Sequence, residues 1–454
     1  MLRALALAIA PVLLAGACSG LPAQRDRTVP VLLCEDAGWC WFQDERVLQL
    51  ADGTVVFGSV ADGRGERDRT GDVQVTSWHS ATGAIQTVEL ADRFERDDHD
   101  VPALHLRTDG RLVAVYAGHG KDNLMRWRVA SQPHSVAAWE PEQRLEVQLG
   151  GEGRGVTYAN LLRVQDAAGK ELLLCAFRGA GCDPQLLVST DDGASWAQGP
   201  KVLGGPGRPY AKYASDGKSA HFVVTEQHPR DFDNSLWHGR VDGTLRTVRG
   251  DGSPVAGTGD VEPQALTRVF AGAADAVAWP CDLELDADGM PVCVFSVQVD
   301  GRGKPRGQAG MDHRYQYARF DGTQWSAHEM AFAGTKLYSG EDDYTGLAAI
   351  VPHDPRFVFV STNAHPVHGT PLVSTRDGRR HWEIWRGFTA DRGRSWTWEA
   401  VTADSTEDQI RPIVPRSAAG SATATVLWLR GSMKSYSNYR LDAVGAVVPL
   451  STSK

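Results

Sequence analysis

The chain has 454 residues, in which 47 Lys and Arg face 56 Asp and Glu, so its formal net charge is −9 at pH 7. This acidic balance argues against nucleic acid as a partner, because binding to a phosphate backbone needs a basic surface. Any anionic ligand must be met by a local cluster of cations, since the overall field repels it.

The first eighteen residues predict export. Arg3 is followed by the apolar run ALALAIAPVLLAGA, which is too short and too interrupted by Pro11 to span a bilayer. The run ends in LLAGAC, which resembles a bacterial lipobox with Cys18 as the lipidated residue. We expect residues 1–18 to be a lipoprotein signal peptide and the mature protein to be an exported lipoprotein. Its lipid alone would anchor it to a membrane, in the outer membrane or facing the periplasm or cell surface. An ordinary secretory signal cut near Ala17 is the alternative.

The rest of the sequence repeats one local pattern. A short alternating strand is followed by an Asp-Gly turn and a second strand, as in VLQLADGTVVFGSV, ALHLRTDGRLVAVYAG and DLELDADGMPVCVFSV. Asp-Gly between two β-rich runs predicts a hairpin, and no long segment has helical periodicity. Four strands at a time give seven units, near residues 44–90, 101–149, 156–203, 208–249, 279–331, 344–402 and 410–450. A period of about 40–50 residues with four strands is typical of a β-propeller.

We therefore predict an all-β fold, a single seven-bladed β-propeller over residues 34–454, preceded by a linker at 19–33. Residues 250–278 fit no unit and are expected to form a long connecting loop. An unpaired edge strand is a liability, so either residues 27–33 or the C-terminal AVVPL should complete the last blade. We expect a monomer.

Two eight-residue motifs support the propeller independently. STDDGASW (189–196) and TADRGRSW (389–396) both match the Asp-box pattern Ser/Thr-x-Asp-x-Gly-x-Ser-Trp. In such a turn the glycine takes a positive φ, the aspartate accepts from backbone N–H groups, and the tryptophan packs between sheets. Asp boxes lie between the third and fourth strands of a blade, so they indicate the fold and not the function.

Polar side chains are expected to converge at one rim of the propeller. His99 and His119 are equidistant from residue 109, inside a hairpin turn, so they should face each other across the strands. Tyr158 and Arg178 are related in the same way about residue 168, in the next unit. Later units should add Tyr344 and His365, and the following candidates for substrate binding: Arg208, Tyr210, Lys212, His228 and Arg411.

These residue types suit β-elimination from a uronic acid. Arginine can hold the carboxylate in a bidentate manner, so that the C5 proton becomes removable. A histidine can take that proton near neutral pH, and a tyrosine hydroxyl can protonate the leaving O4. The alternative is that polar residues at the ends of blades simply cap strands and bind water.

Several longer motifs resemble the BNR-repeat propellers, a group that includes the seven-bladed ulvan lyases. The resemblance runs from about residue 34 to about residue 445. It is carried by segments such as GWCWFQDERVL (38–48), DDHDVPALHL (97–106), YAGHG (116–120), RGVTYANLL (154–162), AFRGAG (176–181), RPYAKYASDGKSAHFVVTEQHP (208–229) and RPIVP (411–415). In those lyases two histidines, a tyrosine and an arginine form the catalytic group. The resemblance implies that His99, His119, Tyr158 and Arg178 are catalytic, with proton transfer by a histidine and the tyrosine and neutralisation of the uronate by the arginine.

The expected function is that of a polysaccharide lyase, which cleaves an anionic polysaccharide of rhamnose and uronate, similar to ulvan. The same propeller group also resembles hydrolases that act on rhamnose–glucuronate linkages. A non-catalytic, glycan-binding surface lipoprotein is a further alternative. A sialidase is disfavoured, because its arginine triad, acid pair and tyrosine nucleophile cannot be assembled from matching positions.

The two histidines are expected to have unequal roles, because two facing imidazoles cannot both carry a charge comfortably. His99, flanked by Asp98 and Asp100, is the predicted partner of Tyr158 in proton transfer, whereas His119 binds substrate or orients His99. Activity should then rise through roughly pH 6–7 and fall near pH 9–10 if Tyr158 must stay protonated.

Six cysteines remain besides Cys18, and the sequence leaves their state open. Cys281 and Cys293 are equidistant from residue 287, and two further pairs are close in sequence, Cys34 with Cys40 and Cys175 with Cys182. An exported protein can oxidise such pairs, or they can stay as buried thiols between the sheets. No cofactor is required for the predicted chemistry, and a structural His/Cys metal site assembled from distant loops stays open.

Overall fold

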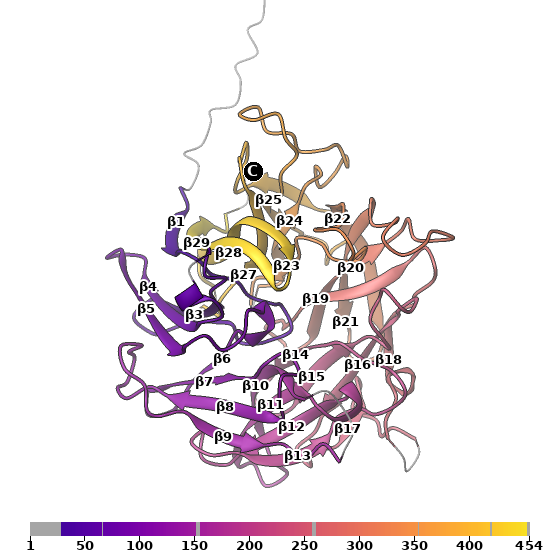
Figure 1. Ribbon diagram of the computed structural model, residues 1–454. Coiled ribbons are helices and arrows are strands. Elements are labelled where there is room, and N and C mark those ends of the chain that lie inside the picture. Colours follow the sequence, from indigo (N-terminus) through magenta and orange to yellow (C-terminus); the bar gives the residue numbers. More distant parts are fainter. Residues whose placement is uncertain are drawn as a thin grey trace, which may run out of the picture.

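The computed structural model describes residues 29–65, 67–150, 155–256, 260–352, 354–417 and 420–451. The predicted signal peptide with Cys18, and residues 19–28 of the predicted linker, lie outside the described residues. Within the described part the strands form seven antiparallel sheets, which follow one another in chain order around the molecule (Figure 1). The predicted seven-bladed β-propeller is confirmed.

The first four sheets each start with the strand nearest the centre. They are β2 (Val47–Gln49), β3 (Thr54–Val60), β4 (Val73–His79) and β5 (Ala84–Ala91); then β6 (Ala103–Leu106), β7 (Leu112–Tyr116), β8 (Leu124–Val129) and β9 (Gln143–Glu146); then β10 (Thr157–Gln165), β11 (Glu171–Arg178), β12 (Pro184–Ser189) and β13 (Ala197–Lys201); then β14 (Ala211–Ser215), β15 (Ala220–Val224), β16 (Leu236–Val241) and β17 (Thr247–Arg249).

The last three sheets complete the ring. They are β19 (Val277–Leu285), β20 (Pro291–Gln298), β21 (His313–Phe320) and β22 (Trp325–Gly334); then β23 (Ala348–Ile350), β24 (Phe357–Thr362), β25 (Glu383–Phe388) and β26 (Thr397–Ala400); and finally β27 (Asp408–Ile413), β28 (Thr423–Ser435), β29 (Asn438–Pro449) and β1 (Val31–Cys34).

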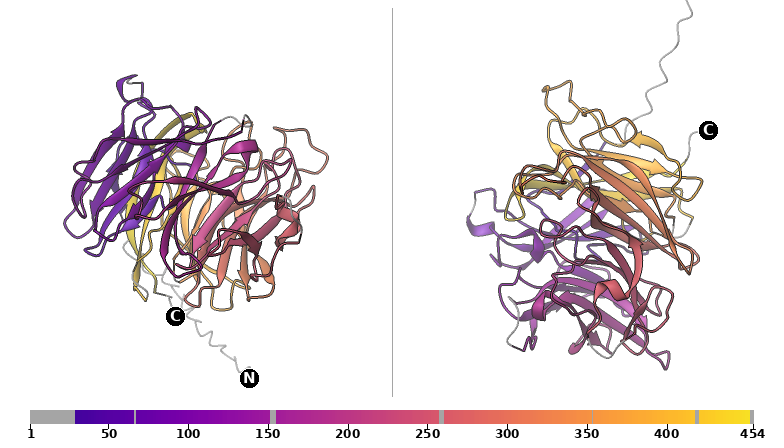
Figure 2. Two further views of the ribbon diagram at one scale, coloured as in Figure 1. Left: turned by 90° about the horizontal axis from the view of Figure 1, so that it is seen from below. Right: turned by 90° about the vertical axis from the view of Figure 1, so that its right-hand side faces the viewer.

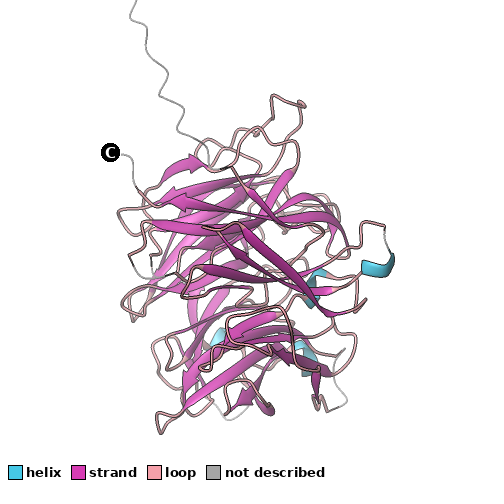
Figure 3. Cartoon of the chain, turned by 90° about the vertical axis from the view of Figure 1, so that its left-hand side faces the viewer, coloured by secondary structure: helices cyan, strands magenta, loops and turns pink. Residues whose placement is uncertain are grey.

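Helix is limited to single turns among the described residues, as Figure 3 shows. The short 3-10 helices are η1 (Arg67–Arg69), η2 (Asp98–Asp100), η3 (Ala180–Cys182) and η4 (Pro263–Ala265). None of these described helices has the length and apolar character needed to cross a membrane.

In the connection at residues 250–278, the residues from 260 onward contain more regular structure than predicted. They include η4 and the strand β18 (Thr267–Phe270), which pairs with the first half of β16, while β17 pairs with the second half. The prediction of a plain connecting loop is therefore wrong, because the exposed edge of β16 is longer than β17 and offers further backbone partners.

Segments near the two ends of the chain pair in the last blade and so close the ring of blades. Strand β1 pairs with β29, with Val31 opposite Gly445 and Leu32 opposite Val444. The first and last sheets are therefore adjacent, as two further views show (Figure 2). The sequence left open whether residues 27–33 or the C-terminal AVVPL complete the last blade. The first four residues of AVVPL lie at the end of β29, and β1 is added beside that strand from the N-terminal side, so the propeller begins a few residues earlier than residue 34.

Both Asp boxes have the predicted form and position. Residues 189–196 join β12 to β13, and residues 389–396 join β25 to β26. In the first box Asp191 accepts from the backbone N–H of Ser195 at 2.9 Å, and Gly193 has a φ of +86°. Burial of Trp196 against the second and third sheets ties the turn to the core.

A buried segment fills the central channel. Residues 37–43 are all buried, and their backbone bonds to several blades: Gly38 pairs with Val60, and the backbone N–H of Cys40 donates to the Asp98 carbonyl. The indole of Trp41 donates to the Pro280 carbonyl at 3.1 Å. This segment, which we call the plug (residues 37–46), is the floor on which the rim residues lie.

The hairpin of β28 and β29 is long, and its end reaches beyond its own blade. Its tip, residues 431–440, is held by other parts of the chain: the hydroxyl of Tyr439 donates to the Val60 carbonyl at 3.2 Å, and Tyr439 and Leu441 are buried. Gly431 has a φ of +140° and its Cα faces the Arg440 carbonyl, where a Cβ would not fit. We call residues 431–440 the arm.

Candidate active site

The two predicted histidines meet as the hairpin register requires. Ala103 pairs with Val115 and Leu106 with Leu112, and continuing this register places His99 opposite His119. Their rings are stacked, with centroids 3.9 Å apart and planes 5° from parallel. His99 lies in η2 and is buried, whereas the side chain of His119 is 23% exposed. We call these two rings the imidazole pair.

Asp97 bridges the imidazole pair. One carboxylate oxygen lies 2.6 Å from Nδ1 of His99 and the other lies 2.9 Å from Nδ1 of His119. Asp97 also caps η2 by accepting from the backbone N–H of His99. Because Asp97 occupies both Nδ1 atoms, each ring presents its Nε2 to the remaining surroundings.

A second carboxylate supports the pair from below. Asp98 Oδ1 lies 2.9 Å from Nδ1 of His99, and Oδ2 accepts from Nη1 of Arg411 at 2.5 Å. Arg411 is buried, and it also donates to the Trp39 carbonyl in the plug. The imidazole pair therefore stands on a buried ion pair that links η2 to the last blade and the plug.

Tyr158 and Arg178 are adjacent, although they are not directly opposed as predicted. A β-bulge shifts the register between Thr157 and Asn160, so Arg178 pairs with Thr157. The bulge gives Tyr158 a φ of +64°, an uncommon conformation for a bulky residue that is typical of functional sites. The guanidinium of Arg178 lies 4.5 Å from the centre of the Tyr158 ring, and its Nη1 is buried without a hydrogen-bond partner among the described residues.

Tyr158 also approaches the imidazole pair. Its ring centre lies 5.4 Å from that of His99 and 6.2 Å from that of His119. The four residues predicted as catalytic are thus brought together at one rim. A cavity of about 20 Å³ opens beside Tyr158 and Arg178.

The fourth blade extends the site on the side of Arg178. The Tyr210 ring has two guanidinium groups near it, with Arg178 at 5.5 Å and Arg208 at 5.6 Å from its centre. His228 packs against Tyr210 at 5.5 Å and accepts from the backbone N–H of Arg230. Burial and the surrounding arginines lower the pKa of His228 to about 2, so this imidazole is neutral.

Charge is distributed unequally over the imidazole pair. Burial and the charge of His99 lower the pKa of His119 to about 4, even though Asp97 opposes this shift. Burial would also lower the pKa of His99, but the anionic groups around it, including Asp97 and Asp98, raise it well above its usual value. At neutral pH the buried ring is an imidazolium and the more exposed ring is neutral.

Tyr158 is held in its protonated form. Burial raises the pKa of its hydroxyl well above the usual value, the neighbouring Tyr210 adds to this, and the positive charges of His99 and Arg178 only partly offset it. At neutral pH the site therefore offers a neutral imidazole, a neutral phenol and a guanidinium with an unpaired donor.

Two substrate-binding candidates are placed below the rim. Lys212 is fully buried, and its ammonium group donates to the Trp41 carbonyl at 2.7 Å and pairs with Asp44 in the plug. Arg411 is equally buried on Asp98. Their positions suit a structural role under the site, whereas Arg208, Tyr210 and His228 lie beside Tyr158 and Arg178.

The structure brings one of the two other rim candidates close to the site and not the other. Tyr344 joins the aromatic cluster above the plug, 5.2 Å from Trp41. His365 instead stacks on His368 at 4.7 Å and contacts Trp385, so the structure does not bring it to the imidazole pair.

Sequence reasoning missed two residues of the site. Asp97 stands next to the DHD turn and could have been found by its N-capping position, since Asp commonly caps a helix at that place. Tyr436, at the tip of the arm, lies 5.2 Å from His99 and 5.5 Å from His119, with its ring almost perpendicular to both. No local signal marked Tyr436, because its place depends on closure of the whole ring.

The six described cysteines are free thiols. Cys293 pairs with Leu283, and Cys281 lies in a register shift between Pro280 and Asp282, so the two do not oppose each other as predicted. Cys40 is buried in the plug within 4.8 Å of the donor atoms of Asp98 and His99. The ligand atoms of Asp97, His99 and His119 also lie within 4.8 Å of one another. The distances between Asp97 and the two rings are, however, those of hydrogen bonds.

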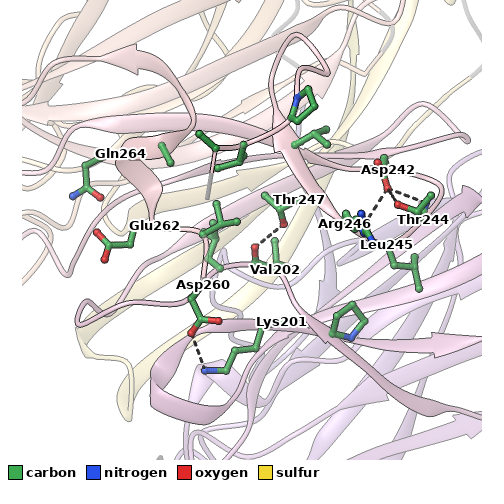
Figure 4. Close-up of a pocket in the computed structure, with 18 residues that line it drawn as sticks. Lys201, Val202, Asp242, Thr244, Leu245, Arg246, Thr247, Asp260, Glu262 and Gln264 are labelled. Atoms are coloured by element: carbon green, nitrogen blue, oxygen red, sulfur yellow. Dashed lines mark hydrogen bonds and ion pairs between the residues drawn. The ribbon is translucent and has the colours of Figure 1, made fainter. Parts of the chain in front are cut away.

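A large cavity lies elsewhere on the molecule. It measures about 1010 Å³ and is formed by the outer strands of the third and fourth blades together with residues from 254–256 and 260–265 (Figure 4). Lys201, Asp242 and Asp260 line it, and Lys201 faces Asp260 at 3.9 Å. None of the candidate site residues is among its lining residues, so its size does not bear on the chemistry of the rim.

Solved structures with a similar fold support the propeller architecture. The chain is similar to a polysaccharide lyase of family PL25, an ulvan lyase bound to -[GlcA(1-4)Rha3S]-, with 14% identity and a TM-score of 0.63 over 91% of this chain and 95% of that chain. A second PL25 ulvan lyase structure gives a TM-score of 0.62 at the same identity and coverage. An α-L-arabinofuranosidase from Fusarium graminearum gives 12% identity and a TM-score of 0.42, over 93% of this chain and 98% of that chain. At these identities the likeness shows the fold alone.

Comparison of the sequence itself identifies the family. No curated protein matches it significantly. The family model of BNR repeat-containing proteins matches residues 65–333, more than half of the chain. The chain therefore belongs to the BNR repeat-containing family.

Proposed function

We propose that this protein is a polysaccharide lyase that cleaves a uronate-containing polysaccharide of the ulvan type by β-elimination. The observation that carries the proposal is the meeting of Arg178, Tyr158 and the imidazole pair at one rim, with the Arg178 Nη1 buried and without a hydrogen-bond partner in the part of the chain that the structure describes. A buried donor without a partner is costly in the free protein and is satisfied when a carboxylate binds. The ulvan lyase of similar fold supports the choice of substrate class.

Arg178 would hold the uronate carboxylate. Its positive charge stabilises the negative charge that develops on the carboxylate when the C5 proton is removed. Tyr210 and Arg208 continue the surface from this point and would contact the neighbouring sugars. Because the protein is acidic overall, an anionic ligand must be bound by a local cluster of cations, and Arg178 and Arg208 provide such a cluster.

His119 is the best candidate for the base. It is neutral at pH 7 and more exposed than His99, and Asp97 fixes its Nδ1 as a donor, which leaves Nε2 free to accept a proton. This reverses the roles expected from the sequence, in which His99 was the base. In this proposal His99 is the charged, buried partner, whose charge adds to the effect of burial in keeping the pKa of His119 low.

Tyr158 would protonate the leaving oxygen. The C5–H bond breaks as His119 takes the proton, the electron pair forms the C4–C5 double bond, and the C4–O4 bond breaks as Tyr158 donates its hydroxyl proton to O4. The proton on His119 then returns to the Tyr158 phenolate through solvent, so both residues are restored. The products are a sugar with a new reducing end, whose anomeric hydroxyl holds the former bridging oxygen, and an unsaturated uronate.

The test is an assay of the purified protein on ulvan, followed by the ultraviolet absorbance of the unsaturated uronate. We expect absorbance from the wild type and a loss of about 10²–10⁴-fold in Tyr158→Phe, as is typical for removal of a general acid. Tyr317→Phe is the matched control, because it removes a buried hydroxyl that bonds to the Pro355 carbonyl far along the chain from this rim. Reducing ends without absorbance would instead indicate a hydrolase, and binding without any product would indicate a glycan-binding protein.

A further inference from the structure

The imidazole pair is enclosed on two sides by residues from different blades. Asp97 lies at the Nδ1 atoms, and the ring of Tyr436 stands across the stack at 87° to His99 and 82° to His119. The distances from the Tyr436 ring centre to the two imidazole centres differ by only a few tenths of an ångström. Tyr436 therefore lies alongside the pair and contacts both rings, whereas a residue at one end of the stack would contact one.

Tyr436 is attached to the site by its backbone as well as its ring. Its carbonyl accepts from the backbone N–H of Asp98 at 2.9 Å, within η2. The arm behind it is fixed by Tyr439 and by Asp442, which accepts from the backbone N–H of Asp36 and pairs with Arg64. A ring that is anchored in this way has little freedom, so it restricts the rotation of the imidazoles that it contacts.

We propose that Tyr436 is a positioning residue, whose aromatic ring holds the two imidazoles in their stacked orientation and shields them from water. The proposal rests on the proposed lyase function only for its kinetic consequences. This role belongs to the aromatic ring of Tyr436 and not to its hydroxyl, because Tyr436 contacts both histidines through its ring, in a perpendicular geometry.

Shielding has a consequence for proton transfer. Burial is the largest cause that lowers the pKa of His119, so a loss of shielding should raise that pKa towards its ordinary value. Other groups also act on the pair and are unchanged by substitution of Tyr436. They are the carboxylates Asp97, Asp98 and Glu95 on the negative side, and Arg178 with Arg411 on the positive side. The Cys40 side chain and the neutral Tyr158 phenol also face His99.

The experiment compares Tyr436→Phe, Tyr436→Leu and Ser437→Ala. The first keeps the ring, the second keeps apolar bulk without an aromatic ring, and the third changes the same turn without touching the histidines. We expect Phe and the Ser437 variant to keep kcat within about threefold. We expect Leu to lose roughly tenfold in kcat, with KM little changed, and to shift the acid limb of the pH profile to higher pH.

The histidine signals of the free protein, followed by NMR during a pH titration, test the inference without any substrate. In Tyr436→Leu the pKa of His119 should rise relative to the wild type, and this readout stands even if the protein is not a lyase. The proposal is overturned if Leu leaves both this pKa and kcat unchanged. It is also overturned if Phe loses as much activity as Leu, because the hydroxyl would then act directly.

Discussion

The two sides of the rim are built in opposite ways. On the imidazole side, the ring atoms Nδ1 of His99 and His119 are bonded to Asp97, and Asp98 is paired with Arg411. On the guanidinium side, Arg178 keeps a buried nitrogen without a partner, and Arg208 makes no ion pair within the described residues. The Nδ1 atoms of the imidazole pair are thus bonded within the protein, whereas the guanidinium side leaves a donor for a ligand. Among the described residues, both oxygens of Asp100 and the Nε and Nη2 of Arg411 are also buried without a hydrogen-bond partner.

This difference separates two tasks of a catalytic site. Proton transfer needs rings in a fixed orientation with defined protonation states, and internal hydrogen bonds provide both before the substrate arrives. Recognition of an anion needs cations whose donors are not already used, because a donor that is bonded inside the protein gains little from the ligand. Substitutions on the two sides should therefore change different kinetic properties: catalytic efficiency and KM on the guanidinium side, and the pH dependence of activity on the imidazole side.

The largest effect is expected on the guanidinium side at Arg178. Arg178→Lys keeps the charge but cannot hold both carboxylate oxygens in one plane, so we expect a loss of about a hundredfold in kcat/KM, or about 3 kcal/mol of transition-state stabilisation. Arg163→Lys, which alters an ion pair with Glu171 in the same blade, is the control. Wild-type turnover in a folded Arg178→Lys variant would remove Arg178 from the mechanism.

On the imidazole side, the expected signature is a shift of pH dependence. The positive charge of His99 lowers the pKa of His119, so His99→Gln should raise that pKa from about 4 towards its ordinary value. The acid limb of kcat/KM then moves to higher pH, with a loss of up to about tenfold near pH 5. His105→Gln, which removes an imidazole bonded to Asp192, should leave the profile unchanged. An acid limb that stays in place or moves down would contradict the assignment of His119 as the base.

The smallest effect is expected at Arg208. A half-exposed cation that meets an anionic polymer gains at most about 1 kcal/mol, so Arg208→Gln should raise KM by up to about fivefold and leave kcat unchanged. Salt screens such a contact, and the difference from wild type should disappear at high ionic strength. Arg268→Gln changes an exposed cation on β18 and controls for net charge. A change in kcat, or no change in KM at low salt, would show that Arg208 does not bind the polymer as proposed.

The sequence alone determined the architecture and half of the site. Asp-Gly turns fix the register of each hairpin locally, so the seven blades and the opposition of His99 to His119 could be predicted from spacing. The Asp boxes were equally local, since a few residues in one turn make all of their hydrogen bonds. The closing strand could be predicted because an open propeller would leave an edge unpaired.

The parts of the site that depend on distant segments could not be predicted from the sequence. The bulge at Tyr158 breaks the simple register and turns Arg178 over its ring. Lys212 and Arg411 are buried because the plug supplies carbonyl and carboxylate partners that no local pattern reveals. Tyr436 reaches the imidazoles because the arm extends from the last blade to η2, which precedes the second blade, once the ring is closed. The hydrogen bonds of a hairpin lie within a few residues of its turn, whereas burial, protonation and contacts between blades depend on how the whole chain packs.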